Sequence, residues 1–254
     1  MSFVVANGVR LHAVALDPPG PPVDPPVVML HGLLIGNLTT WYFTAAPALA
    51  RRRRVLLYDL RGHGRSDVPP SGYDVATQAR DLAGVVACLP RVALVGHSYG
   101  ALIALRFALD HPNRVDRLVL VEAPLPPARM GETAAFARRA PADMAAALPA
   151  ELRAVVGAGG RRARRLVAQL ARLSRDTTLL ADVDAEGDVD DAELARVSCR
   201  ALVVCGRRSA CAPAGERLAR AIPRADFVVL DGGHYLHLDQ PRALTGAIAR
   251  FFDG

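Results

Sequence analysis

The stretch Val95-Gly96-His97-Ser98-Tyr99-Gly100 decides the fold of this chain. The apolar run 92–95 leads into it, and a helix-like stretch at 99–111 follows. A glycine–x–serine–x–glycine sequence between a strand and a helix is typical of a sharp turn that presents a nucleophilic serine. Ligands of doubly wound sheets bind beyond the carboxyl ends of the strands. Ser98 is therefore predicted to stand at such an edge as a nucleophile.

Short apolar runs and helix-like stretches alternate on both sides of this turn, which predicts an α/β fold with a mostly parallel, doubly wound sheet of about eight strands. Residues 3–6 and 11–16 are expected to form an antiparallel hairpin around Asn7-Gly8. The buried strands are predicted at 27–30, 55–58, 92–95, 118–121, 201–205 and 227–230. The helices between them are predicted near 40–50, 73–88, 99–111, 213–222 and 241–252.

The pattern changes between residues 125 and 197, where alanine, leucine and arginine dominate and no strand-like run occurs. This segment is predicted to be a helical cap inserted after strand 118–121, and residues 1–124 with 198–254 are predicted to form the core. Its basic and acidic residues are expected to be solvated helix faces that pair with each other. Its large apolar residues are expected mainly to pack the cap helices on the sheet: Met130, Phe136, Met144, Leu148, Leu166 and Leu170.

Composition excludes several classes of function. The 254 residues suit one domain with a sizeable core. All 31 basic residues are arginine, so mechanisms that need a lysine, such as a Schiff base or a phosphate-binding P-loop, are excluded. No aromatic residues interleave with the arginines, which argues against nucleic-acid binding despite the net charge of +6.

The sequence also lacks targeting and metal signatures. No apolar run approaches the roughly 18 residues of a membrane span, and no basic stretch followed by an apolar one begins the chain. The four cysteines have no metal-binding spacing, so we expect reduced thiols, a cytoplasmic location, no membrane partner and no bound metal.

Three further motifs accompany the serine turn. Leu30-His31-Gly32-Leu33 follows the strand at 27–30, the run Asp59–Ser66 follows the strand at 55–58, and Gly232-Gly233-His234-Tyr235-Leu236-His237 follows the last strand. In this order the motifs resemble those of the α/β-hydrolase superfamily over nearly the full length of the chain. The resemblance implies an α/β-hydrolase fold in which Ser98 is the nucleophile of a serine hydrolase.

The resemblance also implies a catalytic base, which must be a histidine that follows the nucleophile and the acid in the chain. Of the seven histidines, only His111, His234 and His237 come after Ser98. His234 lies in the glycine-rich loop that matches the family's histidine loop and is the predicted base. His111 is expected at a helix end, and His237 is expected to be structural, bonded to Asp239 or to backbone.

The oxyanion hole implied by the resemblance consists of two backbone N–H groups. Tyr99 follows the nucleophile, and Leu33 follows the His31-Gly32 pair. Such donors stabilise the oxygen that becomes negative during acyl transfer. Leu34 is an alternative that lies one residue further along.

The acidic residue that would orient the catalytic histidine departs from the common family pattern. Most relatives carry an aspartate after the seventh strand, and here Ser209 occupies that position. Glu122 follows the strand at 118–121, the place where some branches of the family carry their acid, and is the predicted third member of a Ser98–Glu122–His234 triad. Asp59 and Asp231 are alternatives, although both match structural positions of the family.

These residues predict an enzyme that cleaves a carboxylic ester or lactone through an acyl-enzyme on Ser98. One alternative is a thioesterase, acyltransferase or ring-closing cyclase acting on a natural-product acyl chain. A second is a non-catalytic ligand-binding relative, because the usual aspartate is missing. The expected partner is a small ester, lactone or acyl thioester, with no cofactor, and the sequence does not indicate the oligomeric state.

Overall fold

The strands form one eight-stranded sheet in the order β1-β2-β4-β3-β5-β6-β7-β8 in the computed structural model, which describes residues 2–125, 138–139, 143 and 161–254. The β1–β2 and β2–β4 pairs are antiparallel, and all other neighbours are parallel. The predicted mostly parallel sheet is therefore confirmed. The strands are β1 (Ser2–Ala6), β2 (Val9–Leu16), β3 (Val27–Leu30), β4 (Val55–Tyr58), β5 (Val92–His97), β6 (Val115–Val121), β7 (Arg200–Gly206) and β8 (Ala225–Leu230).

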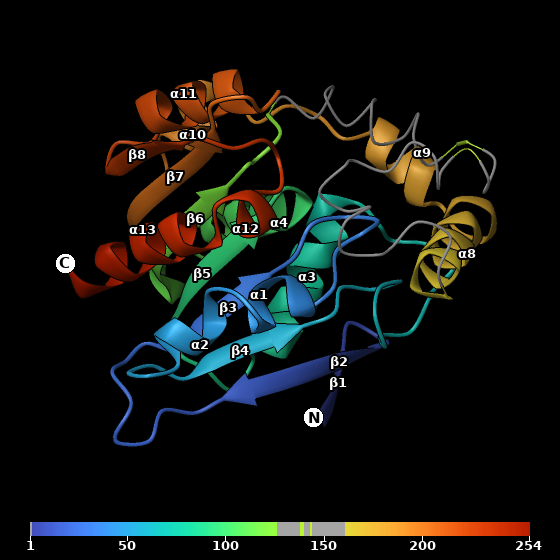
Figure 1. The fold of residues 1–254 in the computed structure, drawn as a ribbon, viewed down its shortest axis with the longest axis horizontal. Helices are drawn as coiled ribbons and strands as arrows, with labels where there is room; N and C mark the ends of the chain where they lie inside the picture. Colours follow the sequence, from blue (N-terminus) through green and yellow to red (C-terminus); the bar gives the residue numbers. More distant parts are fainter. Residues whose placement is uncertain (1, 126–137, 140–142, 144–160) are drawn as a thin grey trace.

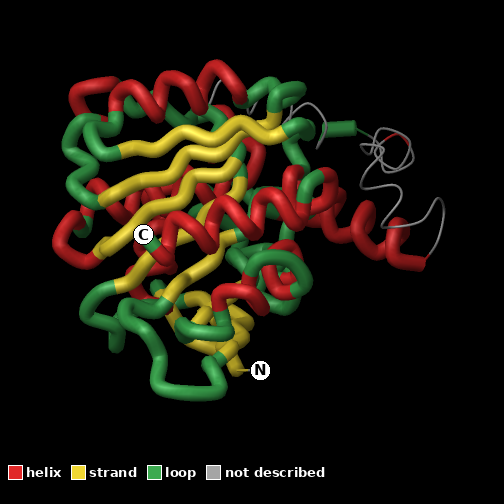
Figure 2. Tube along the Cα trace, turned by 60° about the vertical axis from the view of Figure 1, so that its left-hand side comes forward, coloured by secondary structure: helices red, strands yellow, loops and turns green. Residues whose placement is uncertain are grey.

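Helices cover both faces of this sheet, as Figures 1 and 2 show. Successive residues of a strand point to opposite faces, so Leu94 of β5 packs in the apolar cluster on one face and Val95 packs in the cluster on the other. The first cluster contains residues of α3 (Val75–Val85), α4 (Tyr99–Asp110) and α11 (Ala212–Ala221). The second contains residues of α1 (Thr39–Tyr42), α2 (Ala46–Leu49), α12 (Leu236–Asp239) and α13 (Pro241–Asp253).

Two local features bear on the predicted elements. The hairpin of β1 and β2 turns through Asn7 and Gly8, whose φ angles of 49° and 75° suit a two-residue turn, as predicted. The single helix predicted near 40–50 is instead the two short helices α1 and α2. Pro47 lies in the first turn of α2, where its missing N–H costs nothing, whereas inside a longer helix it would break a hydrogen bond.

The described part of the segment between β6 and β7 is helical. It contains α8 (Arg161–Asp176), α9 (Leu179–Asp184) and α10 (Asp191–Leu194), and α8 and α9 lie toward the right of Figure 1. Leu170 is fully buried and Leu166 packs partly buried against the same core cluster, whereas Met130, Phe136, Met144 and Leu148 lie outside the described residues. No helix among the described residues is long and apolar enough to cross a membrane. The division into core and cap stays a prediction, as does the cytoplasmic location.

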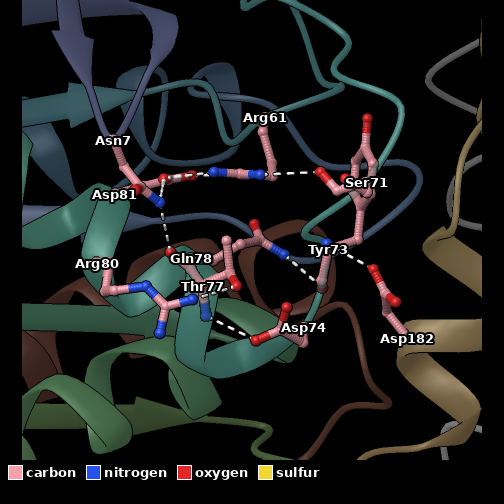
Figure 3. Close-up of polar contacts among 10 residues, drawn as sticks. All are labelled: Asn7, Arg61, Ser71, Tyr73, Asp74, Thr77, Gln78, Arg80, Asp81 and Asp182. Atoms are coloured by element: carbon pink, nitrogen blue, oxygen red, sulfur yellow. Dashed lines mark hydrogen bonds and ion pairs between the residues drawn. The ribbon is translucent and has the colours of Figure 1, made fainter.

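A buried ion pair fixes the loop after β4 to α3 (Figure 3). The Arg61 Nε donates to Asp81 Oδ2 over 2.7 Å and its Nη2 donates to Oδ1 over 2.6 Å, and both side chains are less than 5% exposed. Arg61 also donates to the Ser71 carbonyl over 3.0 Å, and Asn7 donates to Asp81 over 2.9 Å. The network ties the β1–β2 turn, α3 and the loop after β4 into one unit.

We expect Arg61→Met to lower the free energy of unfolding by about 3–5 kcal/mol, because it leaves the Asp81 carboxylate buried without its cation. Urea denaturation followed by circular dichroism measures the loss. The matched control is Arg61→Met with Asp81→Leu, which removes both charges and should recover most of the stability. Equal losses in the single and double variants would contradict this account.

Candidate functional site

Ser98 lies in the turn between β5 and α4 in a backbone conformation that residues with a Cβ rarely adopt. Its φ is 54° and its ψ is −122°. Two glycines allow this turn, because a Cβ on Gly96 would come 2.4 Å from the Gly100 carbonyl oxygen, and a Cβ on Gly100 would come 2.4 Å from the His31 carbonyl oxygen. Strain of this kind persists where packing enforces it and is common at functional sites. The turn therefore has the conformation that the sequence predicts.

Three other polar side chains lie near the Ser98 turn, at the carboxyl ends of the strands that follow β5 in the sheet. Glu122 follows β6, Ser209 follows β7 and His234 follows β8, and the strands β5 to β8 are adjacent in the sheet. Glu122 also has a positive φ of 56°. The parallel arrangement thus gathers residues that are more than 130 positions apart at one edge of the sheet.

These side chains form a continuous hydrogen-bonded chain. The Ser98 Oγ lies 3.0 Å from His234 Nε2, and His234 Nδ1 lies 3.1 Å from Glu122 Oε2. The Glu122 side chain is fully buried, and its carboxylate also accepts hydrogen bonds from the Gly206 N–H and the Ser209 hydroxyl. Three donors therefore compensate the cost of burying the charge. This is the geometry in which a histidine can take a proton from a serine.

The electrostatic environment of His234 favours its protonated form. Burial is the largest influence and acts to lower the pKa, but the hydrogen bonds and the charge interactions with Cys211 and Glu122 together outweigh it and raise the pKa from 6.5 to about 9. Nearby His97 and His237 have the opposite shift, because burial and then a neighbouring histidine lower their pKa values. His234 is therefore the basic member of this histidine cluster.

The backbone beside Ser98 distinguishes Leu33 from Leu34. The Leu34 N–H donates to His63 Nε2 over 2.9 Å, and Leu34 has a positive φ of 65°. Burial, followed by the nearby His31, lowers the pKa of His63 to about 3, so His63 is neutral and accepts this bond. Within the described part of the chain, no hydrogen bond is formed by the N–H groups of Leu33 or Tyr99. Both donors are thus free for a ligand, whereas the Leu34 donor is occupied.

The other acidic residues and histidines considered from the sequence do not join the hydrogen-bonded chain of Ser98, His234 and Glu122. Asp59 accepts hydrogen bonds from the N–H groups of Leu38 and Arg65 and contacts His12, so it orders the loops around it. Asp231 is exposed and pairs with Arg208. The expected bond from His237 to Asp239 is absent among the described residues: His237 Nδ1 is unpaired, and Asp239 accepts from the Gly233 N–H instead. His111 caps the end of α4, as expected.

Two residues at the site were not identified from the sequence. His97 Nε2 donates to the carbonyl oxygen of His234 over 2.9 Å and so fixes the histidine loop to the serine turn. The Cys211 Sγ lies 3.7 Å from His234 Nδ1. His97 occupies a variable position of the serine motif, and Cys211 stands two residues after Ser209. The only signal for either was its closeness in sequence to a candidate residue.

Comparisons with known proteins agree with this architecture. The sequence profile of the alpha/beta hydrolase fold family matches residues 25–158, which is more than half of the chain. An enol-lactonase from Burkholderia xenovorans superposes with a TM-score of 0.79 at 25% identity over all of both chains. A hydrolase from Pseudomonas aeruginosa superposes with a TM-score of 0.80 at 29% identity, covering 100% of this chain and 98% of that one.

Matches to curated sequences are shorter. The 2-hydroxy-6-oxo-2,4-heptadienoate hydrolase of Pseudomonas putida is 42% identical over 128 residues, which are 48% of this chain and 44% of that protein. An uncharacterized protein of Mycobacterium tuberculosis is 47% identical over 103 residues, 39% of this chain and 29% of that protein. The match thus spans less than half the length of these curated relatives. Sheet, serine turn and family profile lead to one conclusion: the chain belongs to the alpha/beta hydrolase fold family.

Proposed function

We propose that this protein is a serine hydrolase that cleaves a carboxylic ester or lactone through an acyl-enzyme on Ser98. One observation carries the proposal, namely the continuous chain from the Ser98 Oγ through His234 to the buried carboxylate of Glu122. A serine becomes nucleophilic when an adjacent base accepts its proton and a third group orients that base. The fold family and the superposition on an enol-lactonase support the same chemistry.

In the proposed mechanism, His234 Nε2 takes the hydroxyl proton as Ser98 attacks the carbonyl carbon. The N–H groups of Tyr99 and Leu33 stabilise the resulting oxyanion. His234 then gives its proton to the leaving oxygen, and a water activated by His234 releases the acyl group. Glu122 keeps the imidazole in the tautomer that accepts at Nε2 and stabilises the imidazolium that forms.

Leu33 is proposed over Leu34 as the second oxyanion donor. The Leu34 N–H is held by His63, and the neutral state of His63 keeps that bond in place. Gly32 lies against the nucleophile, because a Cβ on it would come 3.2 Å from the Ser98 Cβ. The N–H that follows Gly32 is thus close to the reacting centre.

We also propose that residues 125–197 cover the site as a cap on a core of 1–124 and 198–254. Contacts of the described part of this segment with the loop after β4 support this. Gln169 of α8 donates to the Gly62 carbonyl over 3.1 Å, and the Thr178 N–H donates to the Pro70 carbonyl over 2.9 Å. In this family fold, a segment in that position would determine which acyl groups reach Ser98.

A fluorophosphonate probe tests the proposed function directly, because it reacts only with an activated serine. We expect mass spectrometry to find the label on Ser98, and Ser98→Ala to abolish it. Replacement of the exposed Ser71 by alanine is the matched control and should leave labelling unchanged. Product analysis with ester, lactone and acyl-thioester panels then identifies the substrate class. Absence of labelling in folded protein would instead support a ligand-binding relative.

The raised pKa of His234 predicts an alkaline pH profile. Because only the neutral imidazole can accept the Ser98 proton, kcat/KM is expected to rise about tenfold per pH unit below about pH 9 and to level off above it. Initial rates with an ester that has no ionisable group measure the profile. A plateau already reached at pH 7 would contradict the raised pKa of His234, and loss of the pH dependence in His234→Ala is expected if His234 is the base.

The raised pKa of His234 also makes the stability of the fold depend on pH. Stability is expected to fall with rising pH, whereas activity rises. The folded-state pKa of His234 lies above the ordinary 6.5, so its protonation stabilises the fold fully below about pH 6.5, and this contribution is lost as pH rises through about 9. Urea denaturation across this range is expected to show the loss in the wild-type protein. The loss should be smaller in His234→Ala.

A further inference from the structure

A cysteine lies beside the hydrogen-bonded chain, on the edge of the His234 ring away from Ser98. The Cys211 Sγ is 3.7 Å from Nδ1, whereas the Ser98 Oγ contacts Nε2. Cys211 is 5% exposed and Glu122 is fully buried. One ligand atom from each of Glu122, Cys211 and His234 lies within 4.8 Å of the others. A carboxylate, a thiol and an imidazole thus surround one point in space.

We propose that Glu122, Cys211 and His234 form a binding site for a thiophilic divalent cation such as Zn²⁺. In tetrahedral zinc sites the ligand atoms lie about 2.0–2.3 Å from the metal, and therefore about 3.3–3.6 Å from one another. The Sγ–Nδ1 distance of 3.7 Å and the Nδ1–Oε2 distance of 3.1 Å are each close to these values. The ligand atoms of the third pair, Glu122 and Cys211, lie within 4.8 Å of each other and would move closer as the ion enters, and water completes the tetrahedron.

Charge and surrounding hydrogen bonds also fit a divalent cation. The Glu122 carboxylate and the Cys211 thiolate together cancel the charge of the metal, which matters in a buried site. The Gly206 N–H and the Ser209 hydroxyl already orient the carboxylate, as hydrogen bonds to metal ligands commonly do. On binding, the Cys211 thiol and the Nδ1 of protonated His234 each release a proton to solvent, and the ring proton on Nε2 remains. No electron is transferred.

Metal binding at this site would inhibit the enzyme, an inference that rests on the proposed function. With the metal on Nδ1, the remaining ring proton sits on Nε2 and faces the Ser98 Oγ. His234 then donates to the serine instead of accepting its proton, and Glu122 is withdrawn from its orienting role. Active-site acylation therefore requires the metal-free state.

Few other thiols compete for the metal. Burial raises the pKa of Cys205 well above its usual value and that of Cys199 to about 11, so both stay protonated. Cys88 is the exposed cysteine of the four. It serves as the matched control, because zinc bound at a surface thiol would depend on Cys88 and not on Cys211.

Metal binding itself is tested without any activity measurement. Isothermal titration calorimetry with Zn²⁺ is expected to show one site per chain, and Cd²⁺ should give a thiolate-to-metal absorption band. Cys211→Ser should weaken binding at least about tenfold and abolish the band, since one of the three ligands is lost. Cys88→Ser should change neither. Unchanged binding in Cys211→Ser, or loss of binding in Cys88→Ser, would overturn the proposal.

The wild-type protein gives a second test that needs no variant. X-ray absorption at the zinc edge should show one sulfur atom among lighter ligand atoms, and a shell without sulfur would overturn the site. Fluorophosphonate labelling with and without micromolar Zn²⁺ then tests inhibition: we expect at least about a tenfold lower labelling rate, reversed by EDTA. For each variant, the labelling rate with Zn²⁺ is divided by the rate without it, so a change in basal reactivity does not affect the comparison. If the protein binds zinc but is never labelled by the fluorophosphonate, the proposed function is refuted and the proposed metal site is not.

Discussion

Replacement of Ser98 by alanine is expected to lower kcat for ester or lactone hydrolysis by about 10⁶-fold, because it removes the nucleophile while the oxyanion donors remain. The loss is measured in steady-state assays with the substrate that the product panel identifies. Stability should change little, since within the described part of the chain the Ser98 Oγ forms a hydrogen bond only with His234 Nε2. A variant that keeps more than about one part in a hundred of the activity would exclude the acyl-enzyme mechanism.

A double replacement tests whether Ser98 and His234 act as one unit. If His234 serves only to activate Ser98, the Ser98→Ala/His234→Ala variant should be no slower than either single variant. Losses that add in free energy would show that His234 acts on the substrate independently of Ser98. Binding of an inert product analogue, measured by calorimetry, checks that the pocket survives in all three proteins.

The serine turn could be predicted from sequence because its determinants are local. Gly96 and Gly100 are required by contacts within the turn and with the adjacent strand β3, and the apolar run before them identifies β5. A short window of sequence contains most of this information. For the same reason the hairpin at Asn7-Gly8 was predicted correctly, since a two-residue turn needs positive φ angles at both positions.

Contacts between loops could be anticipated only in part. The resemblance predicts Glu122 because some branches of the family carry their acid after this strand, but its bonds to Ser209 and His234 depend on β6 and β7 being neighbours in the sheet. The Leu34–His63 bond and the place of Cys211 beside His234 arise from the same tertiary packing. Spacing along the chain does not encode these distances, so the sequence alone does not predict the proposed metal site.

Glu122→Gln is expected to lower kcat by about 10⁴-fold while the protein stays folded. The Gly206 N–H requires an oxygen at Oε1, so the amide nitrogen of glutamine would face Ser209 and His234 Nδ1. A donor there favours the tautomer with its proton on Nε2, which cannot accept the Ser98 proton. Near-normal turnover in this variant would show that Glu122 is not the acid.

The matched control for this variant is Ser209→Ala, which removes one donor to the carboxylate and leaves the charge in place. We expect a loss of about tenfold, corresponding to one charge-assisted hydrogen bond of about 1.5 kcal/mol. Equal losses in Ser209→Ala and Glu122→Gln would mean that the serine hydroxyl, and not the carboxylate, orients His234.

Moving the carboxylate between loops gives the stricter test of its role. In Glu122→Ala the volume of the carboxyl group is vacated, and an aspartate at position 209 would project into it, because the Ser209 Oγ already contacts Glu122 Oε2. The Glu122→Ala/Ser209→Asp variant is therefore expected to turn over at least about tenfold faster than Glu122→Ala alone. Since the two proteins share the same deletion, recovered activity can come only from a carboxylate near His234 Nδ1. If the added aspartate gives no gain while both proteins fold, the requirement is for Glu122 itself and not for a charge at that point.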